Sequence, residues 1–389
     1  MPVPHFKLPP PPPELEALSL ELCTRLAATI GTDGPMPFSE YMRRVLYEPG
    51  LGYYTGGLIR FGEAGDFITA PELGTLFAQA IARALDPLAQ RLGPDWCLLE
   101  LGPGSGALAC ALLEALEHPP RRYWLLEPSA ALREVQQQRM QMLPDSLKAR
   151  VQWLDTPPGE AWTGVVLANE VIDALPVERF KVGASGPERL AVDWDGTRFA
   201  WTTLPPDDRL LDAYRQLEQT LGRSLPETYQ SELCVDLTPW MRTVLETLER
   251  GLALFIDYGY TAQEYYHPQR DGGTLVCHYR HRAHFDPFAW PGLTDVSAWV
   301  DFSAAARAGQ AAGFDLAGYT TQAAFVLESG VGEQLAGIDD PRQRLALANE
   351  LKQLVLPGQM GEKFKLLALT RQLDTPIHGF STFDQRHRL

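Results

Sequence analysis

The sequence has few cysteines, and their spacing matches neither a metal site nor a disulfide framework. Five cysteines are scattered along 389 residues without C-x-x-C spacing, which is typical of a reducing compartment. Long apolar runs are also missing, since no stretch approaches the roughly 18 apolar residues of a membrane span. The start, MPVPHFKLPPPPPEL, contains neither an apolar signal core nor a transit-peptide pattern. We therefore expect a cytoplasmic protein without membrane insertion.

Positive charge is scarce as well. The formal net charge is −15, which argues against nucleic acid as the main partner because phosphate binding needs a basic face. The same charge is compatible with a cationic partner, such as an arginine- or lysine-bearing segment. The length suits one large domain with insertions, or two domains.

The most informative segment is a strand that runs into three glycines. Residues 95–106 read DWCLLELGPGSG, with Gly102, Gly104 and Gly106 in the turn, and the next apolar run ends at Glu127. Glycine lets the backbone come close to a nucleotide, and a carboxylate at the next strand end accepts hydrogen bonds from ribose hydroxyls. The glycine turn and the acid at the next strand end together predict a Rossmann-like nucleotide site.

An acid before the glycines indicates which nucleotide binds. A dinucleotide fingerprint reads G-x-G-x-x-G and directs amides at a pyrophosphate, whereas this turn reads G-x-G-x-G after Glu100. A carboxylate repels pyrophosphate and attracts the sulfonium and amino groups of S-adenosylmethionine. The motif favours S-adenosylmethionine as the cofactor. An NAD-linked dehydrogenase and a purely structural turn are the alternatives. We also predict cofactor contacts from Ser129, Trp153 and Leu154.

Short apolar strands alternate with helices, which predicts an α/β fold with a parallel, doubly wound sheet covered on both faces. The expected strands are 96–101, 122–127, 150–154, 164–169, 252–257, 315–322 and 364–370. The expected helices are 14–30, 38–47, 106–117, 129–142 and 302–312, with another opened by Pro71 and Glu72.

Two regions depart from this alternation. Residues 188–204 predict a β-hairpin with an Asp-Gly turn at 195–196, followed by helical segments to about residue 250. Residues 260–300, rich in aromatics, His, Pro and Gly, predict an irregular, substrate-facing loop.

These regions divide the chain into four predicted segments. They are an N-terminal helical segment with a cofactor-covering loop (1–90), a first part of the core (91–182), an inserted α+β lobe of hairpin and helices (183–250), and a second part of the core (251–389).

Three histidines in the 260–300 region need separate consideration. His278, His281 and His284 have a three-residue spacing that could bind a metal on one helical face. No carboxylate or cysteine completes a recognisable ligand set, and Pro and Gly nearby indicate irregular backbone. We predict no metal and assign these histidines to loop packing or to a substrate-lining role.

Polar residues follow the fourth strand in GVVLANEVIDALP. Asn169, Glu170 and Asp173 lie where a doubly wound sheet has its ligand crevice. A guanidinium nucleophile needs a carboxylate to hold it and must lose a proton, and Glu170 is the first candidate for this role, before Asp173. Capping of a following turn or helix is the alternative for Asn169 and Asp173. Asp257, at the end of the fifth strand, either orients substrate or binds a loop amide.

Several motifs together resemble the MidA-like family of S-adenosylmethionine-dependent methyltransferases. They include YMRRVLYEPGLGYY, GDFITAPELGTLF, ELGPGSGAL, LLEPSAALR, NEVIDALPVERF and PGQMGEKFKLL. The mitochondrial relative is an arginine methyltransferase involved in complex I assembly. This chain departs from many members at Ser105 and Ala111, where an arginine and an aspartate are frequent.

The resemblance implies a class I methyltransferase fold with an N-terminal helical segment. It also implies that Asp66, Thr69, Pro71 and Glu72 approach the cofactor, and that the Asn169 segment lines the reaction site. The expected function is protein methylation, on an arginine of a respiratory-chain subunit. A small-molecule methyltransferase and a non-catalytic S-adenosylmethionine-binding assembly factor are the alternatives. A homodimer is also expected.

Overall fold

The computed structural model describes residues 8–56 and 70–389, which form two compact units. The sheet unit contains the described parts of Ile68–Ile172, Leu237–Thr261 and Val300–Leu389. The N-terminal unit contains those of Met1–Phe67, Asp173–Asp236 and Ala262–Trp299. Within these described residues, no helix is both long and apolar enough to cross a bilayer.

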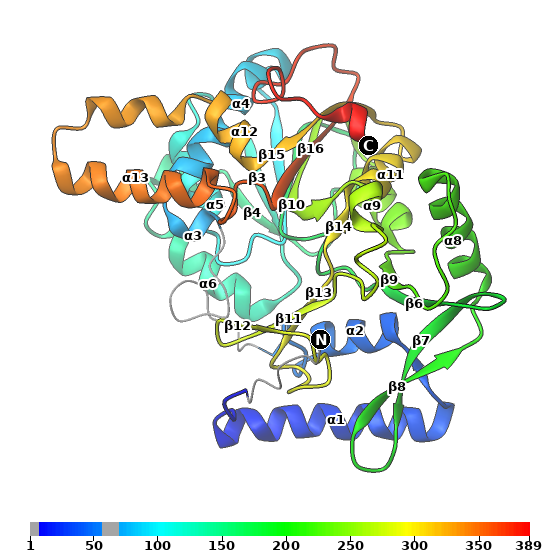
Figure 1. Cartoon of the computed structure of the whole chain (residues 1–389). Helices are drawn as coiled ribbons and strands as arrows, with labels where there is room; N and C mark the ends of the chain where they lie inside the picture. The colour runs from blue at the N-terminus through cyan, green and yellow to red at the C-terminus, as the bar shows by residue number, and fades with distance from the viewer. Residues whose placement is uncertain (1–7, 57–69) are drawn as a thin grey trace. The chain divides into compact units, whose positions relative to one another are not determined.

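The sheet unit is built on strands in the order β15-β16-β10-β5-β2-β3-β4 (Figure 1). The neighbouring strands β10, β5, β2, β3 and β4 are all parallel to one another. Strand β16 is antiparallel to both of its neighbours, β10 and β15. A short β14 extends the end of β10. The strands are β2 (Cys97–Leu101), β3 (Arg122–Leu126), β4 (Val151–Leu154), β5 (Trp162–Asn169), β10 (Leu248–Tyr260), β14 (Val300–Asp301), β15 (Asp315–Thr321) and β16 (Phe364–Arg371). The predicted doubly wound α/β sheet is confirmed.

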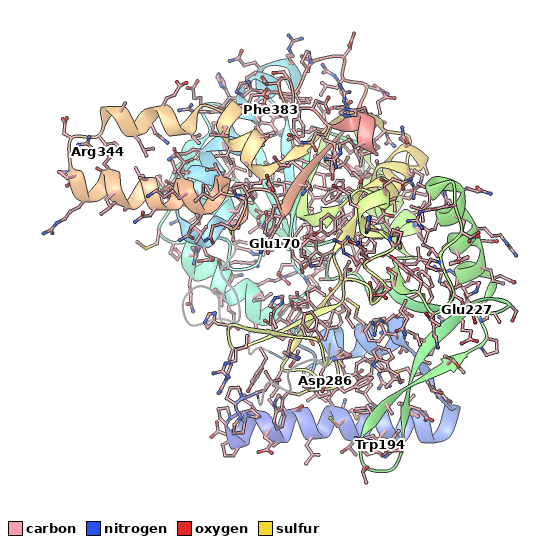
Figure 2. All side chains as sticks on the ribbon, viewed as in Figure 1. Glu170, Trp194, Glu227, Asp286, Arg344 and Phe383 are labelled. Carbon is pink, nitrogen blue, oxygen red and sulfur yellow. The ribbon has the colours of Figure 1, made fainter. Side chains whose placement is uncertain are left out.

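Helices cover both faces of this sheet because successive strand residues point to opposite sides. On β10, Leu254 joins the core cluster formed with α4 and α5, whereas Phe255 contacts Trp240 on α9. The helices are α3 (Ala70–Leu73), α4 (Leu76–Leu92), α5 (Ala107–Ala115), α6 (Ala130–Met140), α7 (Asp145–Lys148), α9 (Leu237–Leu245), α11 (Phe302–Ala311), α12 (Gln322–Glu328) and α13 (Pro341–Val355), with 3₁₀ turns η2 (Val331–Gly337) and η3 (Arg386–Arg388). Figure 2 labels Arg344 where α13 extends away from the sheet.

The single helix expected to open at Pro71 is divided in two. Pro71 lies in α3, which has only four residues, and a separate helix, α4, begins at Leu76. The carboxylate of Glu350 on α13 accepts a hydrogen bond from the Leu76 amide at 2.6 Å, which satisfies an N–H that has no partner inside a helix start. A distant acid therefore defines this helix start, which local sequence could not show.

The N-terminal unit contains two small sheets (Figure 1). One has the order β1-β7-β6-β9 with β8 beside β7, and the other has the order β12-β11-β13. The elements are α1 (Pro13–Asp33), β1 (Met36–Pro37), α2 (Phe38–Tyr47), β6 (Glu178–Gly183), β7 (Gly186–Trp194), β8 (Phe199–Leu204), α8 (Asp208–Leu221), β9 (Gln230–Leu233), α10 (Ala262–Tyr265), β11 (Val276–Tyr279), β12 (Arg282–His284) and β13 (Asp295–Ser297). Leucines of α1 pack with aromatic residues of α2 and β8 in one buried cluster.

Three local predictions in this region need correction. The hairpin exists, but Trp194 pairs with Phe199, so its loop has four residues and not two. Asp195 accepts backbone N–H bonds from Thr197 and Arg198, which stabilises this wider turn. The helical interpretation up to residue 250 missed β9 and the start of β10. The irregular backbone expected at 260–300 is in part the β12-β11-β13 sheet.

Candidate active site

The glycine turn lies at the end of β2 in the sheet unit. Gly102, Gly104 and Gly106 have φ values of 56°, 55° and 79°, a left-handed conformation that side chains other than glycine rarely adopt. A Cβ atom on Gly102 would lie 3.2 Å from Cγ2 of Val171, in the loop that follows β5. A Cβ on Gly106 would lie 3.4 Å from Cγ of Gln136 on α6. The first and third glycines therefore permit both the turn and the close approach of neighbouring segments.

Glu72 reaches this turn from α3. Its carboxylate accepts a hydrogen bond from the Ser105 hydroxyl and pairs with Arg139 Nη2 on α6 at 3.4 Å. Pro71 lies beside it in α3, whereas Asp66 and Thr69 lie outside the described residues. The structure thus brings Glu72 to the glycine turn through the Ser105 hydroxyl.

Glu127 follows β3 and is 4% exposed. Its Oε1 accepts a hydrogen bond from the Ser129 amide at 2.8 Å and its Oε2 one from Gln136 Nε2 at 3.3 Å. Burial raises the pKa of this carboxyl, and the bonds from Ser129 and Gln136 oppose the rise. Ser129 Oγ also caps α6 by accepting from Leu132 N, so the predicted contact residue Ser129 has a structural task as well.

The end of β4 contributes the predicted contact residues Trp153 and Leu154. The Trp153 indole Nε1–H donates to Gln136 Oε1 at 2.8 Å. The Leu154 carbonyl accepts from Arg133 Nη2 at 2.9 Å, and Arg133 Nε also donates to the carbonyl of Glu127. Helix α6 therefore connects the ends of β3 and β4.

Glu100 points into the sheet unit's interior. It is 2% exposed, and its Oε2 accepts a hydrogen bond from the Tyr123 hydroxyl at 2.7 Å. Burial raises the pKa of Glu100 to about 7, although the Tyr123 bond lowers it. The carboxyl therefore exchanges its proton near neutral pH. Its predicted contact with the cofactor stays a prediction.

Asn169 and Glu170 come at the end of β5 (Glu170 is labelled in Figure 2). Glu170 has a φ of 55°, a strained conformation for a side chain of this size. Its amide donates to the Ile256 carbonyl at 2.9 Å, and two residues further along the loop Ile172 N donates to Asp257 Oδ2 at 3.0 Å. Asp257 therefore binds a loop amide, one of its two predicted roles, and holds the loop that carries Glu170.

The amide of Asn169 has one partner and one orphan atom in the described chain. Its Nδ2 donates to Glu170 Oε1 at 3.2 Å, whereas its buried Oδ1 meets no donor among the described residues. Asn169 does not cap a following helix, because residues 170–177 form none. Asn169 therefore keeps an unused oxygen acceptor in an amide that is hydrogen-bonded to the Glu170 carboxylate.

Asp173, the second predicted base, belongs to the N-terminal unit. It is buried, and its carbonyl accepts from the Ala298 amide at 3.2 Å. In the same unit Tyr54 donates its hydroxyl hydrogen to Asp295 Oδ1 at 3.1 Å. Burial first, and then the charges of Asp295 and Asp173, raise the pKa of Tyr54. Asp173 thus belongs to a buried acid–tyrosine group.

The three histidines lie on a hairpin. His278 on β11 pairs with Ala283 on β12, and His281 lies in the turn with a φ of 60°. His284 Nδ1 accepts from the Asp286 amide at 3.3 Å, and burial lowers the pKa of His284. In the described part of the chain, His, Cys, Asp and Glu side chains form no group of three that could hold a metal.

Comparison with known proteins identifies the family and its cofactor. Residues 76–320 match the model of a family described as S-adenosyl-L-methionine-dependent methyltransferases. The crystal structure of a Burkholderia thailandensis protein bound to S-adenosyl-homocysteine is 42% identical, with a TM-score of 0.91 over 98% of this chain and all of that one. The chain belongs to the MidA-like family of S-adenosylmethionine-dependent methyltransferases.

Curated relatives of this methyltransferase come from animals. A mitochondrial protein arginine methyltransferase homologue of Drosophila melanogaster is 30% identical over 96% of this chain and 93% of its own length. The mitochondrial protein arginine methyltransferase of Homo sapiens is 28% identical, over 87% and 81%.

The residues around the turn fit S-adenosylmethionine, the cofactor of this methyltransferase. Each oxygen of Glu127 accepts one hydrogen bond from the described residues, and a carboxylate oxygen can accept two, so capacity for ribose hydroxyls remains. The left-handed glycines present backbone where a side chain would intrude. The cofactor supplies the methyl group, and the chain supplies shape, orientation and charge placement.

The sequence predictions missed three residues around this site. Gln136 bonds to the glycine turn and to Glu127, Arg139 binds Glu72, and Arg133 joins β3 to β4. All three lie on α6, whose mixed pattern of polar residues does not mark which side chains point inward. Burial of Gln136 among three consecutive glutamines is visible only in the folded chain.

Proposed function

We propose that this methyltransferase transfers its methyl group to a guanidinium nitrogen of an arginine in a protein, and that the protein is a respiratory-chain subunit. The names of the Drosophila and human relatives support the arginine and the protein substrate. The family resemblance supports the respiratory subunit. The net charge of −15 suits a cationic segment.

The observation that carries this proposal is the unused acceptor of Asn169. Its buried Oδ1 meets no donor among the described residues, and the Nδ2 of the same amide donates to Glu170 Oε1 at 3.2 Å. An unsatisfied buried acceptor costs roughly 1–3 kcal/mol, so an incoming N–H is favoured there. A guanidinium brings several N–H donors in one plane and matches an amide oxygen beside a carboxylate.

The chemistry assigns separate tasks to the two side chains. The nitrogen lone pair forms a bond to the methyl carbon as the carbon–sulfur bond breaks, and the sulfur keeps that electron pair. The methylated nitrogen then carries one proton too many, and the Glu170 carboxylate accepts it. Asn169 Oδ1 holds a second N–H and orients the guanidinium.

The test is transfer of isotope-labelled methyl groups from S-adenosylmethionine to a protein extract that contains respiratory complexes, followed by acid hydrolysis. We expect labelled methylarginine. Glu170→Gln and Asn169→Leu are expected to lower the rate by about 10–100-fold, whereas Glu160→Gln, at an exposed position, retains it.

Each other outcome contradicts part of the proposal. Label confined to small molecules indicates a small-molecule methyltransferase. Label on protein but on another amino acid rejects arginine, and methylarginine confined to other proteins rejects the respiratory subunit. Bound S-adenosyl-homocysteine without any transfer indicates an assembly factor that binds the cofactor without turnover.

A further inference from the structure

Gln136 lies on the buried face of α6, and 0% of its surface is exposed. The two glutamines that follow it, Gln137 and Gln138, are exposed. An amide that is buried needs partners for two N–H groups and one oxygen, because each unmet group costs free energy. Gln136 finds all three partners in this methyltransferase.

The three partners come from three different strand ends. Nε2 donates to the Gly104 carbonyl in the glycine turn after β2 at 2.8 Å, and to Glu127 Oε2 after β3 at 3.3 Å. Oε1 accepts from the indole of Trp153 on β4 at 2.8 Å. The amide orientation follows from chemistry, since an indole N–H only donates and a carbonyl and an ionised carboxylate only accept.

We propose that Gln136 is a positioning residue for the cofactor, which ties the glycine turn, the Glu127 carboxylate and Trp153 into one geometry. Those three segments are the ones that the sequence predicts to contact S-adenosylmethionine. No shorter side chain at this position reaches three strand ends, and an apolar one leaves a carbonyl, a carboxylate oxygen and an indole N–H without their partner.

The effect on Glu127 follows from the same contacts. Burial raises the pKa of Glu127, and the bond from Gln136 opposes that rise. Gln136 therefore favours the ionised form of the carboxylate and holds it so that its remaining acceptor sites are available to ribose hydroxyls. Packing adds to this, because Gln136 Cγ lies where a Cβ on Gly106 would make contact at 3.4 Å.

The experiment measures binding of S-adenosyl-homocysteine by calorimetry at pH 6 and pH 8, which needs no methyl acceptor and is independent of the proposed arginine substrate. The variants are Gln136→Leu and Gln136→Glu. The matched controls are Gln137→Leu and Gln138→Leu, exposed neighbours on the same helix. Thermal unfolding of each protein without ligand separates binding from folding.

We expect Gln136→Leu to weaken binding by about 10–100-fold at both pH values, the effect of losing hydrogen bonds to a charged group. Gln136→Glu places a second carboxylate beside Glu127. It should bind weakly at pH 8 and recover at pH 6 as the new carboxyl gains a proton that it can donate.

Parent-like binding by folded Gln136→Leu overturns the proposal. Equal weakening in the Gln137→Leu control also overturns it, because the effect would then belong to the helix in general. If Gln136→Leu does not fold, the pH recovery of Gln136→Glu decides alone, and weak binding without recovery at pH 6 rejects the donor role.

Discussion

Replacing Glu100 with glutamine should remove a pH-dependent loss of stability. Glu100 is 2% exposed and accepts a hydrogen bond from Tyr123, and burial raises its pKa from 4.5 to about 7. The folded carboxyl therefore holds its proton more tightly than the unfolded one. Its stabilising contribution is complete below pH 4.5, declines as pH rises to about 7, and is absent above.

The magnitude follows from the two pKa values. A rise from 4.5 to about 7 corresponds to about 3 kcal/mol in total, of which about 2.5 kcal/mol is lost between pH 5 and pH 8. Glutamine has no such titration. Burying its amide adds a cost, but this cost does not change with pH and cancels when the two pH values are compared.

The assay is urea unfolding of the parent, Glu100→Gln and the control Glu114→Gln at pH 5 and pH 8. Glu114 lies on α5 at an exposed position. From pH 5 to pH 8, the parent should lose about 2.5 kcal/mol relative to Glu100→Gln. The control should follow the parent. If all three proteins change in parallel, Glu100 does not titrate as its burial implies, and the argument fails.

Two further predictions concern the backbone around the site. Asp257→Ala leaves the Ile172 amide without its acceptor. We therefore expect kcat to fall about 10-fold or more while S-adenosyl-homocysteine binding changes by less than about 3-fold. Equal losses in kcat and in binding would contradict a role confined to the Glu170 loop. Gly102→Ala forces a side chain into a φ of 56° and should cost about 1–2 kcal/mol in unfolding free energy. Gly159→Ala, with no atom within 4 Å of its Cβ, is the control, and equal stability of the two variants would refute the strain.

The core of the fold could be predicted from sequence because its signals are local. Buried parallel strands appear as short apolar runs, and β2, β3 and β5 lie within two residues of their predicted limits at each end. The glycine turn was expected from its place after a strand. The strands β6 and β9 were missed because they are short and mixed in character, and because β9 pairs with a strand that is distant in sequence.

The candidate site was only partly predictable. Glu72, Glu127 and Trp153 were expected near the cofactor, and the structure brings all three to α6 or to the glycine turn. Nothing in the sequence showed that Gln136 connects them, since its neighbours Gln137 and Gln138 are identical and exposed. The left-handed backbone of Glu170 was equally invisible, because its cause is the attachment of its loop to β10.

The sequence alone determined the alternation of strands and helices in the sheet unit, the glycine turn and the acids at the strand ends, because apolar periodicity and steric freedom act over a few residues. The tertiary structure decided how the buried polar groups pair. Gln136 meets Gly104, 32 positions away, and Ile172 meets Asp257, 85 positions away. Such pairs form only once folding has removed water from around them, and so the geometry of the methyltransferase site belongs to the folded chain.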